Sequence, residues 1–415
     1  MSEILSFMVN RIKTLLVGTL ALLASSIIQA QPTAILAGQD QDNRVITTAV
    51  PFLMIAPNAR AGAMGETGVA TSPDANSIHW NNAKLAFIDN DIGFSLSYSP
   101  WLNKIINDMS VSYLSGYKKL TREQAIGVSI RYFDLGDIQL TDVNGNPLGE
   151  FNPREFSIDG TYSRILTENL SIGVTARFIH SNLSGNFTAP GNDGRNGTSI
   201  AVDFGVFYTK DLTLSGNNSN LSLGAHISNI GRKITYSNDD NNDFIPGNLR
   251  LGGAFRTNLD PYNTITFALD FNKLLVPSPP IYELDDDGSF VLDADGNPRI
   301  LSGSDPNRSL LSGTFGSFGD APDGFSEELQ EVTISSGIEY WYKELFAARA
   351  GYFWEHENKG NRKYFTVGIG FRYQVFGIDF SYLIPQDQNH PLADTLRFSL
   401  LFNFDNPGTE DSITE

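Results

Sequence analysis

The sequence of 415 residues contains no cysteine. This absence excludes structural disulfides, cysteine-based metal sites, thiol nucleophiles and a lipid-modified N-terminal cysteine. Basic residues are also scarce, because 29 Lys and Arg stand against 47 Asp and Glu, for a formal net charge of -18. Since binding to phosphate groups needs clustered Lys and Arg, this charge balance argues against a nucleic-acid partner.

Long apolar runs are missing outside the N-terminal region, and the mean hydropathy of -0.17 is too polar for a bundle of membrane-spanning helices. The chain is nevertheless 41% hydrophobic and 11% aromatic, so it can enclose a large structure. A transmembrane β-barrel reconciles these facts, because only every second residue must be apolar while the others face a polar lumen.

The N-terminal apolar run covers residues 15–28. Arg11 and Lys13 precede it and the small residue Ala30 follows it, which is the arrangement of a secretory signal peptide. The run is shorter than the ~20 residues that a spanning helix needs, which disfavours the alternative of a permanent anchor. We therefore predict a cleaved signal peptide over residues 1–30.

From residue 91 onward the dominant period of the sequence is two, which is typical of β-strands with one apolar face. In residues 172–178, 265–271 and 365–371, glycine, threonine and charged residues occupy the face opposite the apolar one. That mixture suits a wet lumen, although the solvent face of a soluble sandwich would look similar along any single strand.

The lengths of the connections distinguish the barrel from the sandwich. The pattern yields about fourteen strands between residues 91 and 404, an even number that would bring both termini of the barrel to the periplasm. The short connections are residues 119–123, 164–169, 257–262, 342–345 and 373–376, and long ones are residues 136–152, 181–196, 231–244 and 274–327. Short connections follow even strands and most long ones follow odd strands, as short periplasmic turns and long external loops require. We predict an all-β membrane fold, a 14-stranded antiparallel outer-membrane β-barrel.

The predicted last strand carries Leu396, Phe398, Leu400, Phe402 and Phe404 on one face. This arrangement resembles the C-terminal signal that barrel-assembly machinery recognises. Many barrels stop at the terminal Phe, whereas residues 405–415 continue here as an acidic tail, which we expect to be periplasmic and disordered.

Residues 31–90 do not alternate and are rich in glycine and alanine, which allow tight turns and close packing inside a lumen. We predict that this segment is a plug, or hatch, that fills the barrel. The residues expected to form it are Asn58, Arg60, Gly62, Met64, Gly65, Gly68, Trp80, Asn81 and Asn82.

The predicted plug also carries a family resemblance. The run 58–70, followed by Asp74, Ala75 and the run 79–83, resembles the hatch of the FadL-like barrels. Within them the chain is most similar to the PorV-type barrels of the type IX secretion system, and the likeness extends to residues 391–403 at the end of the barrel. Asn82 is a departure, because FadL-like proteins commonly carry proline there in an Asn-Pro-Ala motif, and this weakens a transporter interpretation.

The resemblance implies a function that composition could not reveal. PorV-type barrels are shuttles that bind the C-terminal domain of secreted cargo proteins. They receive the cargo from a giant SprA-type translocon and carry it to an attachment complex that contains the PorU-type sortase. The barrel itself does no chemistry. Two alternatives remain, FadL-type uptake of hydrophobic small molecules and a purely structural barrel.

No catalytic or cofactor site is expected. None of the five histidines lies in a helical metal pair or beside a recognisable nucleophile motif. Residues 142–147 and 293–298 place oxygen ligands at alternate positions, as calcium loops do, but Asn-Gly and Asp-Gly between apolar flanks favour hairpins.

Two apolar clusters in predicted external loops are the candidate partner-binding residues. The first loop supplies Trp101, Leu102, Ile105 and Ile106, and the fifth, acidic loop supplies Phe315, Phe318 and Phe325. Exposed apolar clusters usually mark contacts, and a protein groove can cover them whereas lipopolysaccharide headgroups cannot. The alternatives are that Trp101 belongs to an aromatic belt against the outer-membrane lipids, and that the fifth loop is disordered.

Overall fold

The computed structural model describes residues 44–102, 104, 106, 108–141, 144–183, 195–214, 216–236, 242–387 and 390–405. All of them belong to one compact unit, residues 42–415. The predicted signal peptide, the start of the predicted plug and most of the predicted acidic tail lie outside the described residues. Among the described helices, none is both long and apolar enough to cross a membrane.

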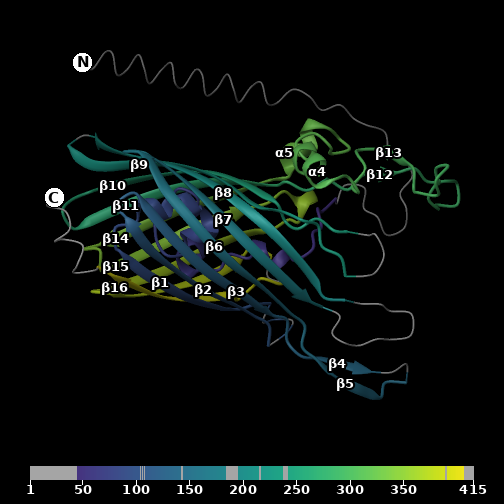
Figure 1. The fold of residues 1–415 in the computed structure, drawn as a ribbon, viewed down its shortest axis with the longest axis horizontal. Coiled ribbons are helices and arrows are strands. Elements are labelled where there is room, and N and C mark those ends of the chain that lie inside the picture. Colours follow the sequence, from purple (N-terminus) through teal and green to yellow (C-terminus); the bar gives the residue numbers. More distant parts are fainter. Residues whose placement is uncertain are drawn as a thin grey trace, which may run out of the picture. The chain divides into compact units, whose positions relative to one another are not determined.

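The unit is a closed antiparallel barrel (Figure 1), and the predicted fold is confirmed. Its strands are β1 (Ile92–Pro100), β2 (Ser110–Thr121), β3 (Gln124–Asp134), β6 (Arg154–Thr167), β7 (Leu170–Asn182), β8 (Gly197–Leu214), β9 (Asn217–Gly231), β10 (Asn248–Asn258), β11 (Asn263–Leu274), β14 (Val332–Tyr342), β15 (Phe346–Trp354), β16 (Lys363–Tyr373), β17 (Phe376–Pro385) and β18 (Leu396–Phe404). Each strand pairs with its neighbour in this order, and β1 closes the ring by pairing with β18, from Ile92↔Phe404 to Tyr98↔Phe398.

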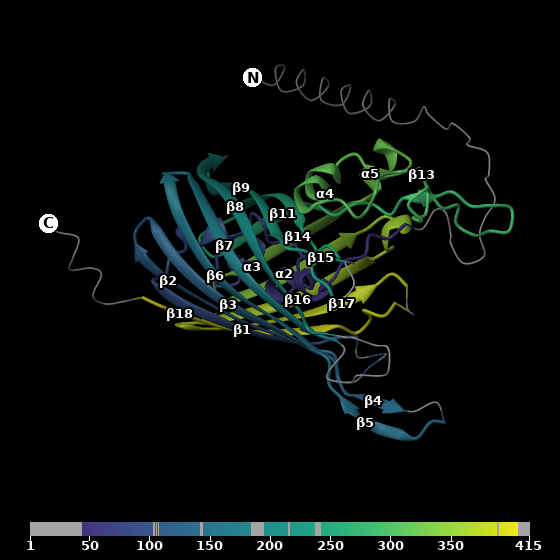
Figure 2. The same ribbon diagram turned by 45° about the vertical axis from the view of Figure 1, so that its right-hand side comes forward.

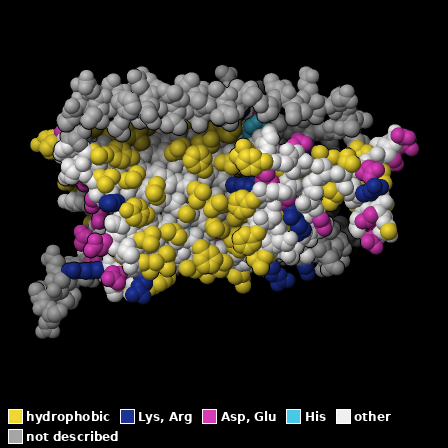
Figure 3. Space-filling view, turned by 90° about the horizontal axis from the view of Figure 1, so that it is seen from above, with side chains coloured by type: hydrophobic (Ala, Val, Ile, Leu, Met, Phe, Trp, Pro, Cys, Tyr) yellow, Lys and Arg dark blue, Asp and Glu magenta, His cyan; other side chains and the backbone are white. Residues whose placement is uncertain are grey.

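Side chains alternate between the two faces of the barrel wall. In β11, Phe267 and Leu269 are exposed on the outer face while Asp270 is buried on the inner one, and in β18 Phe398 points outward and Arg397 inward. Figure 3 shows hydrophobic side chains spread over the wall, with charged side chains mainly toward the two ends. This is the surface that a lipid-embedded barrel requires, because the hydrocarbon region has no partner for a charge.

The two ends of the barrel differ in their connections. We call the end with short connections the turn end and the end with long connections the loop end. At the turn end, β14 and β15 are joined by Lys343 and Glu344, both with positive φ, as a tight hairpin with right-handed twist requires. The loop end carries two small ribbons, β4 (Ile138–Thr141) with β5 (Pro147–Phe151) and β12 (Ile281–Tyr282) with β13 (Ile300–Ser302). It also carries the short helices α4 (Leu310–Gly316), α5 (Phe325–Gln330) and η3 (Glu357–Lys359).

The hairpin interpretation of the two acidic motifs agrees with these ribbons. The first motif lies between β4 and β5, with residues 142 and 143 outside the described part, and the second is enclosed by a bridge between Leu292 and Pro298. Within the described residues, no group of three or more His, Cys, Asp or Glu side chains could hold a metal ion.

The segment that precedes β1 lies inside the barrel (Figure 2). It contains η1 (Pro51–Met54), α2 (Ala59–Gly62), α3 (Ser77–Trp80) and η2 (Asn82–Phe87), all short turns of helix. Nearly every side chain from residue 56 to residue 86 is buried. We call residues 44–90 the lumenal segment. It runs from Arg44, which contacts α5 at the loop end, to the start of β1 at the turn end.

Candidate partner-binding surface and filled lumen

Buried ion pairs join the lumenal segment to the barrel wall. Arg60 of α2 donates to both carboxylate oxygens of Glu339 on β14, with Nε–Oε2 at 2.9 Å and Nη2–Oε1 at 2.7 Å. Glu339 also accepts from Arg349 of β15 at 2.7 Å, and Arg349 bonds Asp379 of β17 at 2.8 Å. Since a buried charge is tolerated only when it is paired, this chain of charges ties the lumenal segment to three strands.

Glycines on the inner face make room for the lumenal segment. A Cβ atom at Gly351 would lie 2.0 Å from the backbone nitrogen of Gly65, and one at Gly173 would lie 2.5 Å from the backbone nitrogen of Ala83. One at Gly205 would lie 2.2 Å from the Asn82 side chain. Gly173, on a face that the sequence pattern assigned to a wet lumen, therefore contacts the lumenal segment.

The turn between α2 and α3 is held by one carboxylate. Asp270 of β11 accepts from the backbone nitrogens of Gly68 at 2.7 Å and Val69 at 3.0 Å. Gly68 packs so closely on the indole of Trp80 that a Cβ would lie 2.3 Å from it. The Trp80 indole nitrogen donates to Asn58 at 2.8 Å, so the two ends of this stretch are joined.

The other predicted plug residues are also buried in the lumen. Asn81 donates to the carbonyl oxygens of Val69 at 3.2 Å and Val206 at 3.0 Å, and Asn82 donates to Thr175 at 2.8 Å. Gly62 lies against Arg397, and Met64 is fully buried. The sequence thus located the inner side of these contacts. It did not identify Glu339, Arg349, Asp379 or Asp270 as their partners, and the only available signal was a charged residue on the inward face of a strand.

The four candidate residues of the first loop are called the first-loop tip. Those that the structure describes differ in their burial. Trp101 and Leu102 are half-buried and pack against two apolar clusters at the loop end, one of which includes Phe52 of η1 and Phe133 of β3. Because the first of these clusters contains residues of the lumenal segment, Trp101 contacts the inside of the barrel mouth. Ile106 remains exposed, and Ile105 lies outside the described residues.

The fifth loop, residues 275–331 between β11 and β14, is folded, and the alternative of simple disorder is wrong. It contains β12, β13, α4 and α5, and it presents large apolar side chains to the surface. Phe315 is 72% exposed and Phe325 is 75% exposed. We call the exposed set the loop-5 apolar face: Leu311, Phe315, Phe318, Phe325 and Leu329.

The opposite side of α5 is held by a buried ionic anchor. Lys273, at the end of β11, binds Glu328 at 2.8 Å and Glu331 at 2.5 Å. Lys359 of η3 binds Glu327 at 2.6 Å and Glu331 at 2.9 Å. We call these two lysines and three glutamates, with Arg44, the ionic anchor.

Arg44 ties the lumenal segment into this anchor. Its guanidinium contacts Glu327 at 2.8 Å and also pairs with Asp323. Burial disfavours the charged form of Glu327, but hydrogen bonds from Arg44 and Lys359 outweigh it and lower the pKa of this carboxyl group to about 2. Glu327 therefore stays charged at every physiological pH.

The loop-5 apolar face and the first-loop tip lie at different positions around the barrel. The tip follows β1, whereas α5 precedes β14, and β15, β16, β17 and β18 lie between those strands in the barrel order. The structure brings Phe315, Phe318 and Phe325 together in one loop, and Trp101 with Leu102 in another.

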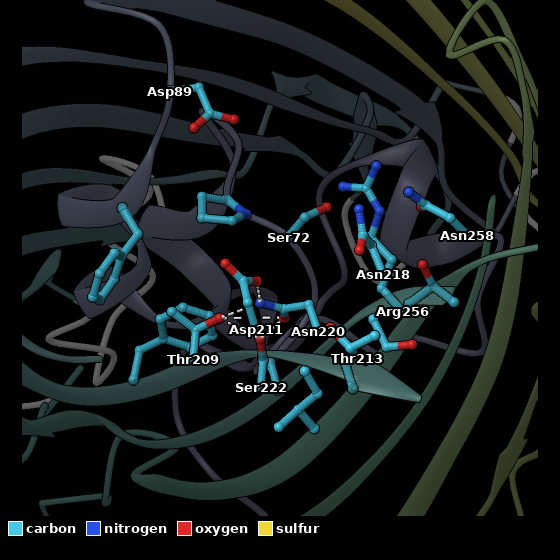
Figure 4. Close-up of a pocket in the computed structure, with 18 residues that line it drawn as sticks. Ser72, Asp89, Thr209, Asp211, Thr213, Asn218, Asn220, Ser222, Arg256 and Asn258 are labelled. Atoms are coloured by element: carbon cyan, nitrogen blue, oxygen red, sulfur yellow. Dashed lines mark hydrogen bonds between the residues drawn. The ribbon is translucent and has the colours of Figure 1, made fainter. Parts of the chain in front are cut away.

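Cavities lie at the turn end of the barrel. One of them has a volume of about 690 Å³ and opens between the lumenal segment and β8, β9 and β10. Its lining is mixed polar and apolar, and Figure 4 shows Thr209, Asp211, Asn220 and Ser222 gathered on one side of it. Asn220 donates to Asp211 at 2.8 Å, so these side chains satisfy one another.

These features define a class of protein: an outer-membrane β-barrel whose lumen holds its own N-terminal segment. The chain belongs to the PorV family, because the family model described as type IX secretion system protein PorV matches residues 38–281. No curated protein sequence matches the chain.

Solved structures with a similar fold include hydrocarbon transporters. The toluene transporter TbuX of Ralstonia pickettii is 12% identical, with 84% of this chain and 98% of that chain covered and a TM-score of 0.44. The toluene transporter TodX of Pseudomonas putida is 13% identical, with 82% and 95% covered and a TM-score of 0.45. A FadL homologue of Pseudomonas aeruginosa is 11% identical, with 87% and 100% covered and a TM-score of 0.38.

Proposed function

We propose that this barrel is the outer-membrane shuttle of a type IX secretion system. It binds the C-terminal domain of secreted cargo proteins, collects them from a SprA-type translocon and delivers them to an attachment complex with a PorU-type sortase. Membership of the PorV family supports the secretion system. The observation that carries the role of the surface is the loop-5 apolar face, displayed on a loop that the ionic anchor holds rigidly.

Because the lumenal segment occupies the lumen, binding of a protein partner at the outer surface is favoured over transport of a small molecule through the barrel. Arg60, Glu339 and Arg349 form a buried charged cluster between the lumenal segment and the wall at β14 and β15, and a hydrophobic molecule gains nothing by displacing ion pairs. The cavity of about 690 Å³ has a mixed polar and apolar lining and lies at the turn end. Uptake of hydrophobic small molecules, such as the toluene that TbuX and TodX transport, is therefore the weaker alternative for this chain.

The proposed orientation places the turn end in the periplasm and the loop end outside the cell. Ile92 and Phe404, the two ends of the barrel, pair with each other at the turn end, where connections are short. Short turns suit the periplasmic side, because the assembled barrel inserts from there. In this orientation the loop-5 apolar face and the first-loop tip, Trp101, Leu102, Ile105 and Ile106, are both available to partners.

Aromatic side chains dominate the energies of protein interfaces, so the loop-5 apolar face should supply the main contacts. Trp101 and Leu102 are half-buried and pack against the apolar cluster at the barrel mouth. Among the described residues of the tip, Ile106 is therefore the exposed one. We therefore propose the loop-5 apolar face as the principal partner surface and the tip as a secondary one.

The experiment is copurification from native outer membranes with the double variant Phe315→Ser and Phe325→Ser. We expect recovery of the translocon or cargo to fall at least tenfold at unchanged barrel abundance, since truncating each interface anchor costs about 1 to 2 kcal/mol or more. The matched control is Phe290→Ser with Leu292→Ser, two exposed apolar residues of the same loop outside the face. Equal recovery with both double variants would reject loop 5 as the partner surface.

A further inference from the structure

The position of Lys273 shows on which side of the barrel wall α5 lies. In β11 the outer face carries Phe267, Leu269 and Phe271, all exposed. Because side chains alternate along a strand, Lys273 belongs to the same outer face. It is nevertheless buried, since Glu328 and Glu331 cover it. The helix α5 therefore covers the outer side of the wall at Lys273, while its Glu327 reaches Arg44 of the lumenal segment at the loop end.

The two ribbon views agree with this placement. In Figures 1 and 2, α4 and α5 lie to one side of the barrel near its loop end, beyond the wall formed by β11 and β14. The helix α4 contacts the loop end, because its Gly313 packs on Phe244 and Pro277, in the connections that precede β10 and follow β11.

The level of α5 along the barrel follows from strand geometry. Tilted strands cross an apolar band of about 25 Å in about ten residues. β11 begins at Asn263 at the turn end, so Lys273 lies near the far edge of this band. The helix α5 is thus at the boundary between hydrocarbon and headgroups, next to the lipid-facing residue Phe271.

The polarity of the two helices is inverted relative to helices on a water-facing surface. Such helices turn apolar residues inward and charges outward. Here Glu327 and Glu328 of α5 are buried inward in the ionic anchor, whereas Phe325 and Leu329 are exposed. In α4, Thr314 is buried while Leu311 and Phe315 are exposed. An outward apolar face at the edge of a bilayer is the arrangement of a helix that lies in the membrane interface.

We propose that the loop-5 apolar face is embedded in the membrane leaflet at the loop end, where lipid acyl chains cover it in the free protein. In the proposed orientation this is the outer leaflet. The buried Lys273 attaches α5 beside the lipid-facing residue Phe271 of β11, and the ionic anchor buries Glu327 and Glu328 away from the lipid. This role goes beyond the shuttle function, because it describes what occupies the surface when no partner is bound.

The test uses the absence of cysteine, which allows a single labelled cysteine at any chosen position. The variants Phe315→Cys and Phe325→Cys, each carrying an NBD fluorophore, are reconstituted into phosphatidylcholine vesicles that contain a lipid with a spin label near the glycerol. Leu269→Cys, on the lipid-facing wall, is the positive control, and Asp295→Cys, in the exposed hairpin, is the negative control.

We expect the spin-labelled lipid to quench the label at positions 315 and 325 at least half as strongly as the label at position 269. The label at position 295 should be quenched least. Folding of each variant is checked by the heat-dependent shift of barrel mobility in gels. Quenching at 315 and 325 no stronger than at 295, in folded protein, would overturn the proposal.

A second arm separates this proposal from the shuttle function. If the labels are exposed to water in pure vesicles but shielded in native outer membranes, a protein covers the face. That result overturns the lipid proposal and leaves the shuttle function standing. If the labels are quenched in vesicles and the double variant Phe315→Ser with Phe325→Ser still recovers its partner, the lipid proposal is supported and the partner surface lies elsewhere.

Discussion

Arg60 and Glu339 form a bidentate ion pair inside the barrel, with N–O distances of 2.9 and 2.7 Å, although 279 positions separate them in the chain. Both side chains are buried. The pair joins the lumenal segment to β14, and Arg349 and Asp379 extend it across the wall. It therefore couples the position of the plug to the closure of the barrel.

The first prediction is that Arg60→Ala destabilises the protein by about 3 to 5 kcal/mol, because Glu339 would be left buried with one partner fewer. Unfolding in urea, followed by gel mobility, gives the change in the free energy of unfolding. Arg256→Ala is the matched control: it removes an ion pair with Glu344 in which both side chains are exposed, so its cost should stay below about 1 kcal/mol. Equal costs would show that the lumenal pair adds nothing specific.

The second prediction concerns close backbone packing. Gly351→Ala should displace the lumenal segment, because the new Cβ would meet the backbone of Gly65 at 2.0 Å and cannot be accommodated by a side-chain rotation. Overpacking of this kind costs about 1 to 3 kcal/mol. The control is Gly160→Ala in β6, where nothing lies within 4 Å of the added atom. Protease cleavage within residues 44–90 should accelerate for the first variant alone, and similar cleavage of the two would contradict the packing argument.

The third prediction concerns pH. The ordinary pKa of Glu327 is 4.5 and its value in the folded protein is about 2, so the carboxylate stabilises the fold fully above pH 4.5. That contribution disappears as the pH falls from 4.5 toward 2, when Glu327 becomes protonated and releases Arg44 and Lys359. Limited proteolysis of loop 5 by pepsin should therefore remain slow at pH 4 and accelerate toward pH 2.

Glu327→Gln supplies the control for the pH prediction. It removes the charge without changing the size of the side chain, so loop 5 should already be cleaved faster at pH 4, with a weaker acceleration toward pH 2. Wild-type loop 5 that is released between pH 6 and pH 5 would contradict the lowered pKa of Glu327.

The fourth prediction compares the two faces of β11. Leu269→Arg places a charge on the lipid-facing wall and should cost roughly 2 to 4 kcal/mol. Alternation alone suggests that the inward neighbour would tolerate substitution better. The structure reverses this expectation for Asp270, since Asp270→Ala would leave the Gly68 and Val69 amides without a partner at about 1 to 3 kcal/mol each.

The same urea titration measures both variants of β11. The reference variant is Thr266→Ala, which removes a small inward-facing side chain that bonds neither the Gly68 nor the Val69 amide. We expect its cost to be below about 1 kcal/mol. A cost for Asp270→Ala no greater than that for Thr266→Ala would mean that water, and not the lumenal segment, occupies that part of the barrel.

The sequence by itself determined the barrel and the general role of the segment before it. Alternation in residues 265–271 identifies β11 and its two faces, because the pleat of a strand imposes a period of two whatever the strand pairs with. The lengths of the connections separate the turn end from the loop end. The small residues around Gly62 and Gly65 predict close packing, since they allow the backbone to approach the barrel wall.

Only the tertiary structure decided which charges meet and which apolar loop residues remain exposed. Trp101 and Phe315 are both large apolar residues in long loops, yet Trp101 packs into the mouth of the barrel while Phe315 stays exposed. No local pattern distinguishes them, because burial depends on what distant strands bring alongside. Likewise, Arg60 could pair with any inward carboxylate, and the register of the closed barrel places Glu339 next to it. Local periodicity is a property of the chain, whereas these partners exist only once the barrel has closed.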